Sequence, residues 1–253
     1  MARAVLVIAG SDSGGGAGIQ ADLAALRDHG VHGCTAITAI TAQNTRGVRG
    51  VHLLPPEVVV AQIEAVLDDV EVGAIKIGML GDVGIVTAVA DALAAARAPI
   101  VLDPVMVSTS GHRLLTEAAI GALRDRLAPL AMVCTPNLPE AWAWVGSDEE
   151  EDLLAWVRHT GVPLVVTGGD AEEGEVVDRL IRPSGIRRWV GRRIPGEPFH
   201  GTGCTFASAL AARVACGEPL DDAVAGAIRY VRRRLEAAIR PGHGAAIGGV
   251  VRD

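Results

Sequence analysis

The sequence predicts an α/β fold in which helices cover both faces of a mainly parallel central sheet. Short apolar runs alternate with segments of helical periodicity along most of the chain, as in strand–helix–strand units. Late in the chain this alternation gives way to two strands, at 175–181 and 186–194, with the turn residues Pro183-Ser184-Gly185 between them. That pattern predicts an antiparallel hairpin at one edge of the sheet.

The other expected strands are short runs of apolar or β-branched residues that end at glycine, proline or polar residues. The first ends at Gly10, and the fourth ends at Asp103-Pro104. We expect these strands at residues 4–9, 34–40, 74–77, 99–102, 132–135 and 164–167.

The expected helices carry apolar residues at spacings of three or four and are bounded by punctuating residues. Gly30 ends the first helix, Pro55-Pro56 suits the first turn of the second, and the acidic run 148–151 favours a helix N-terminus. Gly217-Glu218-Pro219 separates the last two helices. We expect helices at residues 17–29, 55–70, 82–96, 116–127, 148–159, 204–215 and 220–239, and a short helix opening at 136–140.

Length and composition bound the class of protein. The chain has 253 residues, 49% of them hydrophobic, which suits one domain over residues 1–253 with a sizeable core. A net charge of −7 opposes binding to nucleic acids and anionic membranes, and an aromatic content of 3% leaves few rings for base stacking. We therefore expect neither a nucleic acid nor a membrane as a partner.

The cysteines and the N-terminus favour a cytoplasmic location. The four cysteines are scattered, without the Cys-x-x-Cys pair that would indicate a metal site or a disulfide framework. The apolar run that follows Met1-Ala2-Arg3 is too short for a signal peptide or a membrane span. We also expect a homo-oligomer, a dimer, with tryptophans such as Trp142 in packing or interface positions.

Polar residues gather where the expected strands end. Ser11-Asp12, Gln43-Asn44, Asp103 and Asn137 each follow an apolar run. Ligands of parallel α/β sheets bind beyond the carboxyl ends of the strands. We therefore expect the functional site at this edge of the sheet.

The run His200-Gly201-Thr202-Gly203-Cys204-Thr205 predicts a glycine-rich loop that opens a helix. Free backbone N–H groups and the helix dipole make such an N-terminus a phosphate cradle. The same positive end favours a thiolate at Cys204. The alternative is an ordinary loop in which Cys204 is a small buried apolar residue.

Six blocks in this order resemble the hydroxymethylpyrimidine/phosphomethylpyrimidine kinases of thiamine biosynthesis. They are residues 9–23, 41–48, 76–80, 102–106, 135–140 and 200–205. The resemblance covers nearly the full chain. It implies the ribokinase-like fold, a three-layer α-β-α sandwich, in agreement with the pattern of strands and helices.

The resemblance implies ATP-dependent phosphorylation of 4-amino-5-hydroxymethyl-2-methylpyrimidine and then of its monophosphate, with ATP and Mg²⁺ as cofactors. Such a transfer is mainly positioning and electrostatics. By the same resemblance, Cys204 is the general base that takes the hydroxyl proton. Gly201, Thr202 and Gly203 then cradle the charge that develops on the γ-phosphate.

The resemblance also assigns residues to the pyrimidine. Gln43 is expected to recognise the ring, because an amide pairs as donor and acceptor with an aminopyrimidine edge. The remaining substrate-binding residues are expected to be Gly10, Ala17, Asp22, Met79, Val105 and Val107. Asp22 has a structural alternative as a solvated helix residue, and Met79 has one as ordinary core.

A third set of residues is assigned to the nucleotide. Asp103 and Glu140 are expected to face Mg²⁺, which prefers oxygen ligands. The residues expected near the ATP phosphates are Asp103, Asn137, Glu140, Thr167 and Gly169. Asn137 and Glu140 also have the three-residue spacing of a helix capping box, and the two roles are compatible.

Lys76 is the single lysine among 23 basic residues. Its retention in an arginine-rich chain predicts a site where a forked guanidinium would not fit. We expect Lys76 to be buried and paired with a carboxylate near the strand ends.

The chain departs from the family pattern at Thr167-Gly168-Gly169-Asp170, where many members have Lys-Gly-Gly-His. A cation that the family is thought to place near the ATP phosphates is missing. The departure leaves a non-catalytic pyrimidine sensor open as an alternative.

Two further readings stay open at the level of sequence. Pyridoxal or pyridoxine kinase activity would use the same loop and Cys204 on another hydroxymethyl-bearing ring. Thiol-nucleophile chemistry would pair Cys204 with His200, four residues earlier.

Overall fold

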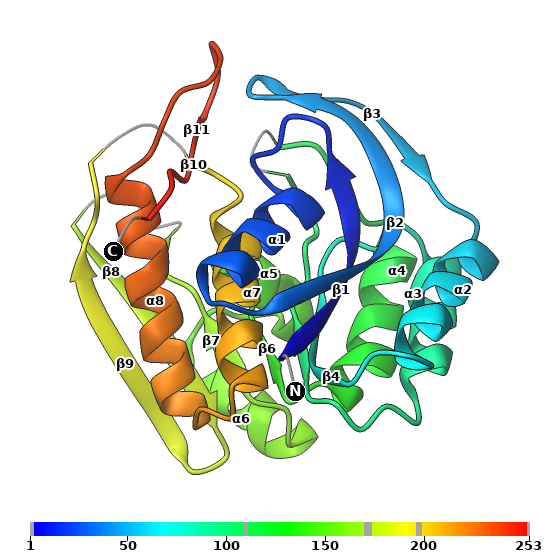
Figure 1. Ribbon diagram of the computed structural model, residues 1–253. Coiled ribbons are helices and arrows are strands. Elements are labelled where there is room, and N and C mark those ends of the chain that lie inside the picture. Colours follow the sequence, from blue (N-terminus) through cyan, green and yellow to red (C-terminus); the bar gives the residue numbers. More distant parts are fainter. Residues whose placement is uncertain (1–2, 109–110, 170–173, 196–198, 252–253) are drawn as a thin grey trace.

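A computed structural model describes residues 3–108, 111–169, 174–195 and 199–251. A nine-stranded sheet runs through the molecule in the order β3-β2-β1-β4-β5-β6-β7-β8-β9 (Figure 1). Its strands are β1 (Ala4–Asp12), β2 (His32–Asn44), β3 (Gly47–Leu53), β4 (Val72–Ile77), β5 (Ile100–Leu102), β6 (Val133–Cys134), β7 (Leu164–Val166), β8 (Glu175–Arg182) and β9 (Gly185–Arg192). The pairs from β2 to β7 are parallel, which confirms the mainly parallel sheet.

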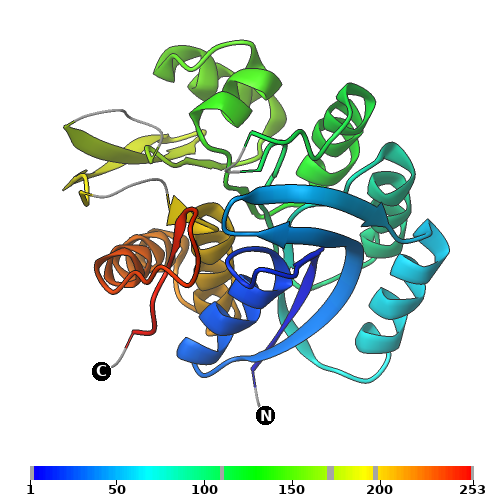
Figure 2. The ribbon, with the colours of Figure 1, turned by 90° about the horizontal axis from the view of Figure 1, so that it is seen from above.

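Helices cover both faces of this sheet (Figure 2). They are α1 (Gly18–Asp28), α2 (Pro56–Leu67), α3 (Val83–Leu93), α4 (Glu117–Ala122), α5 (Leu138–Val145), α6 (Glu150–Thr160), α7 (Thr202–Ala215) and α8 (Leu220–Glu236). The segment expected as one helix at 116–127 continues beyond α4 as a π-helical turn, Leu123–Leu127.

The alternation of side chains along β1 divides the core into two layers. Leu6 and Ile8 belong to the cluster that packs under α2 to α6, whereas Val5 and Val7 belong to the cluster under α1, α7 and α8. Successive strand residues point to opposite faces, so a continuously apolar strand is buried on both sides. The three-layer α-β-α sandwich is therefore confirmed.

Both edges of the sheet are antiparallel. The hairpin of β8 and β9 lies at one edge, as expected. At the other edge β3 pairs with β2, and the sequence pattern missed β3 because Gly47 and Gly50 interrupt a half-exposed run. A second small sheet, of β10 (Phe199–His200) and β11 (Ala246–Ile247), was also missed, because two-residue strands carry no periodicity.

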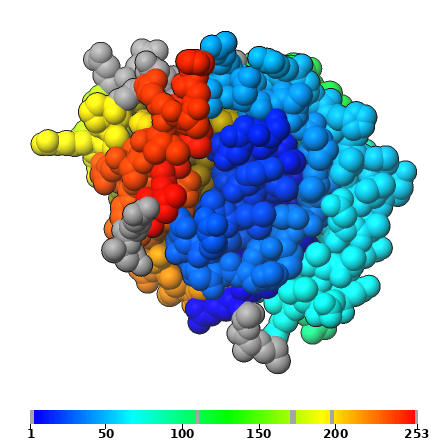
Figure 3. Space-filling view, turned by 45° about the horizontal axis from the view of Figure 1, so that its top comes forward, coloured from blue at the N-terminus to red at the C-terminus, as the bar shows by residue number. Residues whose placement is uncertain are grey.

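The C-terminal segment, red in Figure 3, lies against the N-terminal third of the chain, which is blue to cyan. The Tyr230 hydroxyl donates to Asp28 Oδ2 at 2.7 Å, and the Ala245 N–H donates to the Thr45 carbonyl oxygen at 2.8 Å. These contacts hold α8 and the last strand beside α1 and the turn after β2. Within the described ranges, no helix has the length and apolar character needed to cross a bilayer.

Candidate active site

A cavity of about 1050 Å³ opens at the carboxyl ends of the parallel strands, where the sequence predicted the site. The N-terminus of α7 closes one side, and residues of β8 and α8 extend the cavity beyond it. Fifteen of the sixteen predicted site residues line it: Gly10, Ala17, Gln43, Met79, Asp103, Val105, Val107, Asn137, Glu140, Thr167, Gly169, Gly201, Thr202, Gly203 and Cys204.

Asp22 is the exception. It is fully buried in α1 and does not line the cavity, so the expected contact with substrate and the solvated alternative are both wrong. Its carboxylate instead accepts the Ser208 hydroxyl at 2.7 Å and lies 3.1 Å from Lys76 Nζ. Helix packing takes precedence here, because α1 turns this residue toward α7 rather than toward the pocket.

Lys76 is buried and paired, as its singularity predicted. Its ammonium lies 3.1 Å from Asp22 and 3.8 Å from Asp103 Oδ2, at the end of β4. Burial opposes the charge, but the surrounding acidic groups, Asp22 first, raise the pKa of Lys76. The lysine is therefore a permanent cation behind the wall of the cavity.

Asp103 links Lys76 to the cavity, because its carboxylate lies 3.8 Å from the Lys76 ammonium and the residue lines the cavity. Burial raises the pKa of its carboxyl to about 6, and the nearby Lys76 ammonium limits that rise. Oδ2 is buried and has no hydrogen-bond partner among the described residues. Near neutral pH the group is mostly ionised and has an oxygen available to a bound ion or substrate.

Cys204 lies near Asp103, and each of the two groups affects the pKa of the other. Burial raises the pKa of the Cys204 thiol to about 12, although Lys76 and a backbone hydrogen bond from Gly18 lower it. Desolvation therefore favours the thiol form of Cys204, against the thiolate expected from the helix dipole.

The glycine loop has the conformation that a phosphate cradle requires. Gly201 precedes the first residue of α7 with a φ of 80°, in the left-handed region that glycine tolerates. A Cβ at this position would collide with the carbonyl oxygen of Gly16. Thr202, Gly203 and Cys204 form the first turn, where backbone N–H groups have no partner within the helix, and all three residues line the cavity.

Asn137 and Glu140 form the capping box that their spacing allowed. Asn137 Oδ1 accepts the Glu140 N–H at 2.8 Å, and Glu140 Oε2 accepts the Asn137 N–H at 3.0 Å. Glu140 Oε1 also accepts the Met106 N–H at 3.2 Å. The carboxylate thus joins α5 to the loop after β5 while it lines the cavity.

No cluster of three or more acidic, histidine or cysteine side chains that could hold a metal ion occurs in the described part of the chain. Asp103 and Glu140 therefore do not form a closed protein cage. Mg²⁺ does not need one, because it keeps several waters and binds through one or two carboxylates together with phosphates.

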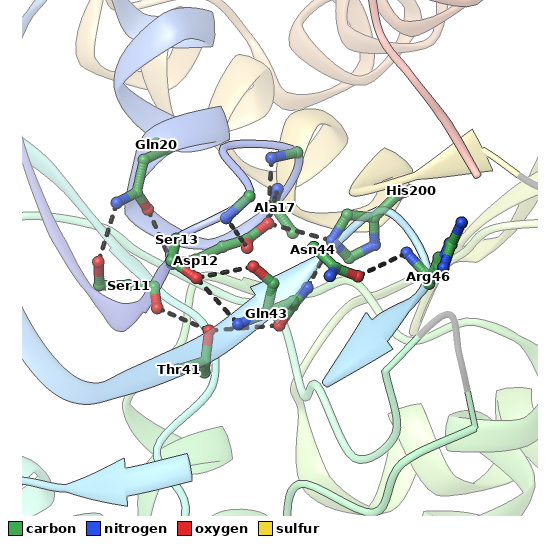
Figure 4. A network of polar contacts seen from close by, with 12 residues as sticks. Ser11, Asp12, Ser13, Ala17, Gln20, Thr41, Gln43, Asn44, Arg46 and His200 are labelled. Carbon is green, nitrogen blue, oxygen red and sulfur yellow. Dashed lines mark hydrogen bonds and ion pairs between the residues drawn. The ribbon is translucent and has the colours of Figure 1, made fainter. Parts of the chain in front are cut away.

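A polar network joins the first strand, the second strand and the loop before α7 (Figure 4). Asp12 accepts the backbone N–H groups of Gly14, Gly16 and Ala17 at 2.7, 3.0 and 2.9 Å. His200 Nε2 lies 3.1 Å from Asp12 Oδ2 and 2.7 Å from the side-chain amide of Gln43. The ring-binding candidate Gln43 is therefore held by residues from three separate segments.

The sequence model of one protein family, described as phosphomethylpyrimidine kinase, matches residues 12–248. The chain belongs to the phosphomethylpyrimidine kinase family. The hydroxymethylpyrimidine/phosphomethylpyrimidine kinase of Rhizobium meliloti is 44% identical over 247 residues, which cover 95% of this chain and 93% of the relative.

Two further comparisons extend the family assignment. The thiamine biosynthesis bifunctional protein of Geobacter sulfurreducens is 44% identical over 95% of this chain, and the chain spans 51% of that protein's length. The crystal structure of Bacillus subtilis pyridoxal kinase, an ADP complex, superposes with a TM-score of 0.90 at 32% identity, covering 99% of this chain and 98% of that chain. The fold is thus ribokinase-like.

The far end of the cavity is where this member of the phosphomethylpyrimidine kinase family departs from the expected pattern. Thr167 bridges to Asn137 and lines the cavity, and the Gly168 N–H donates to Asp178 Oδ1 at 3.0 Å. Arg193 Nη1 donates to the Gly169 carbonyl oxygen at 3.1 Å and also lines the cavity. Arginine cations therefore reach this end, while Asp170 lies outside the described residues.

Sequence reasoning missed the role of His200 in this family member. Its partner Asp12 lies 188 residues away, and only the fold brings the two together. The available sequence signal was that Asp12 and His200 both lie in blocks that resemble the family, at 9–23 and 200–205. The Nε2 contacts and the protonated thiol disfavour the pairing of His200 with Cys204 that thiol-nucleophile chemistry requires.

Proposed function

We propose that this protein transfers the γ-phosphoryl group of ATP to the hydroxymethyl group of 4-amino-5-hydroxymethyl-2-methylpyrimidine, and then phosphorylates the monophosphate to the pyrophosphate. One observation carries the proposal. The Gln43 amide and the N-terminus of α7 with Cys204 line the same cavity. An aminopyrimidine held by the amide therefore shares one chamber with a phosphate cradle.

The phosphate side of the reaction relies on the backbone. The N–H groups at the start of α7 and the positive end of its dipole stabilise charge on the transferred phosphoryl oxygens. Asp103 Oδ2, buried and without a hydrogen-bond partner among the described residues, and the Glu140 carboxylate fit the donor set that Mg²⁺ prefers. When bound, the ion neutralises charge on the phosphate oxygens.

The proton of the substrate hydroxyl passes to Cys204 and Asp103. In a loose transition state the hydroxyl keeps its proton until its bond to phosphorus is largely formed. Cys204 therefore does not need to be ionised beforehand. It accepts the departing proton on Sγ as its own thiol proton passes to the nearby Asp103 carboxylate.

Pyridoxal kinase activity is the second candidate, and the likeness to the Bacillus subtilis enzyme favours it. The hydroxymethylpyrimidine/phosphomethylpyrimidine kinase of Rhizobium meliloti is more similar in sequence, at 44% identity against 32% for the Bacillus subtilis pyridoxal kinase. The Gln43 amide offers a donor and an acceptor side by side, which suits an aminopyrimidine. The aminopyrimidine is therefore the preferred substrate.

The activity is tested by incubating the protein with Mg²⁺-ATP and either hydroxymethylpyrimidine or pyridoxal, following ADP release and identifying the products by mass. We expect the pyrimidine monophosphate and pyrophosphate. Phosphorylation of pyridoxal alone would move the protein to the second candidate. Pyrimidine binding without ADP release would favour the sensor.

We also propose a single-domain, cytoplasmic homodimer. Both core clusters pack on one sheet, which supports one domain. All four cysteines are free, which suits a reducing compartment.

Trp142 and Val190 are each 59% exposed, which supports an interface between copies. Sedimentation equilibrium tests the dimer, and a monomer at every concentration would contradict it.

A further inference from the structure

One ring nitrogen of His200 faces two partners at the cavity edge (Figure 4). His200 Nε2 lies 2.7 Å from the side-chain amide nitrogen of Gln43 and 3.1 Å from Asp12 Oδ2. All three residues line the cavity. Because a single ring nitrogen either donates or accepts, the two contacts constrain each other.

Asp12 determines which of the two roles the ring nitrogen takes. Its carboxylate already accepts three backbone N–H groups of the loop before α1. Burial raises the pKa of Asp12, but the His200 and backbone hydrogen bonds lower it overall, so the group is an anion near neutral pH. An ionised carboxylate only accepts. His200 Nε2 must therefore carry a hydrogen and donate it.

A hydrogen on Nε2 in turn determines the orientation of the Gln43 amide. A half turn exchanges the amide nitrogen and oxygen without moving any other atom. The carbonyl oxygen then accepts from His200, and the amide nitrogen donates to Thr41 Oγ1, 3.3 Å away. The Thr41 hydroxyl donates to the Ser11 carbonyl oxygen at 3.0 Å. Each contact then joins a donor to an acceptor, with the Nε2 hydrogen shared between Asp12 Oδ2 and the Gln43 carbonyl oxygen.

The opposite orientation leaves an unfavourable contact. With a hydrogen on His200 Nε2, the Gln43 N–H would point at another N–H. Without that hydrogen, a ring lone pair would face the Asp12 carboxylate. Either arrangement places like charges together in a partly buried site, where a mismatched polar contact costs about 1–3 kcal/mol.

We propose that Asp12 and His200 fix the orientation of the Gln43 amide, and that His200 is thereby a specificity-determining positioning residue for ring recognition. This inference rests on the proposed function. With its carbonyl held by His200, the amide keeps one further N–H and one further lone pair. These match a ring nitrogen and the neighbouring exocyclic amine of an aminopyrimidine. Pyridoxal has no exocyclic amine to match.

Two amide variants that differ in reach test the inference. In His200→Gln the longer side chain places an N–H donor near the position of Nε2, whereas His200→Asn falls short of it. We expect His200→Asn to raise KM for hydroxymethylpyrimidine about tenfold, with little change in kcat and in KM for ATP or pyridoxal. His200→Gln should retain the wild-type KM within about threefold. The exposed residue His159 lies outside the cavity, and His159→Asn is the control.

A double-mutant cycle separates positioning from a general structural effect. In a Gln43→Ala background, His200→Asn should produce no further rise in the pyrimidine KM, because both changes remove the same contact. An equal rise in that background, a parallel rise in the pyridoxal KM, or no rise in the single variant would overturn the inference. If His200→Asn fails to fold, Thr41→Val provides a second test, because it removes the hydroxyl that contacts the Gln43 amide on the side away from His200. This variant should show the same selective rise in KM for the pyrimidine, and an unchanged KM would also overturn the inference.

Turnover by the wild-type protein distinguishes a failure of the proposed function from a failure of the proposed role of His200. Absence of pyrimidine turnover in the wild type would contradict the proposed function. Pyrimidine turnover in the wild type combined with an unchanged KM in His200→Asn would contradict only the role of His200.

Discussion

Lys76 Nζ lies 3.1 Å from each carboxylate oxygen of Asp22, and neither side chain is exposed to solvent. On its other side the ammonium lies 3.8 Å from Asp103 Oδ2. One buried cation thus serves two buried carboxylates. It connects the interior of α1 to the residue that meets the Cys204 thiol in the cavity.

Loss of the Lys76 charge should destabilise the fold. Lys76→Met leaves two buried carboxylates without their cation, which costs about 3–5 kcal/mol for a pair of this kind. Denaturant unfolding followed by circular dichroism measures the loss. The double variant Lys76→Met/Asp22→Leu should recover part of it, because it removes one stranded anion. A loss below about 1 kcal/mol in the single variant would show that the ion pair contributes no more than a surface pair.

Loss of the Cys204 thiol should reduce turnover without unfolding the protein. Cys204→Ala removes the group that receives the hydroxyl proton, and such groups contribute about 10²–10⁴-fold to the rate. Steady-state kcat with saturating Mg²⁺-ATP and hydroxymethylpyrimidine measures the effect. Cys216→Ala, outside the cavity, is the matched control. Activity within a few-fold of wild type would remove Cys204 from the proton path.

Turnover should fall in acid as Asp103 gains a proton. Burial raises the pKa of this carboxyl to about 6, and only the ionised form accepts a proton from Cys204. The value of kcat/KM for ATP, which reports the enzyme before nucleotide and Mg²⁺ bind, should therefore be full above that pKa and decline as the pH falls through it. The pH profile of kcat/KM for ATP measures this limb. A profile that stays flat down to about pH 5 would contradict the relay through Asp103.

The loop before α7 should tolerate no side chain at its first glycine. Gly201→Ala combines a left-handed φ of 80° with a collision against the Gly16 carbonyl oxygen. Gly217 has the same φ in open space, so Gly217→Ala isolates the conformational cost of about 1–2 kcal/mol. Gly201→Ala should lose clearly more unfolding free energy, and nearly all activity. Equal effects of the two variants would show that the close approach does not matter.

Arg193 should contribute to nucleotide binding. It lines the end of the cavity where Thr167 stands in place of the lysine seen in many family members. Arg193→Ala should raise KM for ATP several-fold and leave KM for the pyrimidine unchanged, since an exposed cation gives a modest gain. Its exposed neighbour Arg192, outside the cavity lining, provides the control Arg192→Ala.

Thr167→Lys should lower KM for ATP if a cation is limiting at this end of the cavity. Equal KM values for ATP in all three variants and the wild type would remove both positions from nucleotide binding.

Local patterns were sufficient for most of the fold and for the place of the site. Apolar runs that end at polar residues predicted the parallel strands, and the carboxyl-end rule then placed Asp103 and Asn137 together. Lys76 could be predicted as buried because it is the single lysine of the chain. The antiparallel strand β3 could not, because glycines and exposed arginine and histidine residues hide its alternation.

The remaining differences depend on packing, which sequence spacing does not express. Asp22 points into the protein because α1 lies against α7, and no local pattern encodes that rotation. The ionisation of Cys204 also depends on packing, because desolvation by the surrounding chain raises the pKa of its thiol. The contact of His200 with Asp12 joins residues that lie 188 positions apart, so it exists only in the folded protein.

The proposed aminopyrimidine kinase activity is tested most directly by kcat/KM for hydroxymethylpyrimidine and for pyridoxal, measured side by side with Mg²⁺-ATP on one preparation. The donor–acceptor pair of Gln43 predicts a value at least about tenfold higher for the pyrimidine, since an unmatched buried polar group penalises the wrong ring. An equal or higher value for pyridoxal, or no ADP release with the pyrimidine, would contradict it.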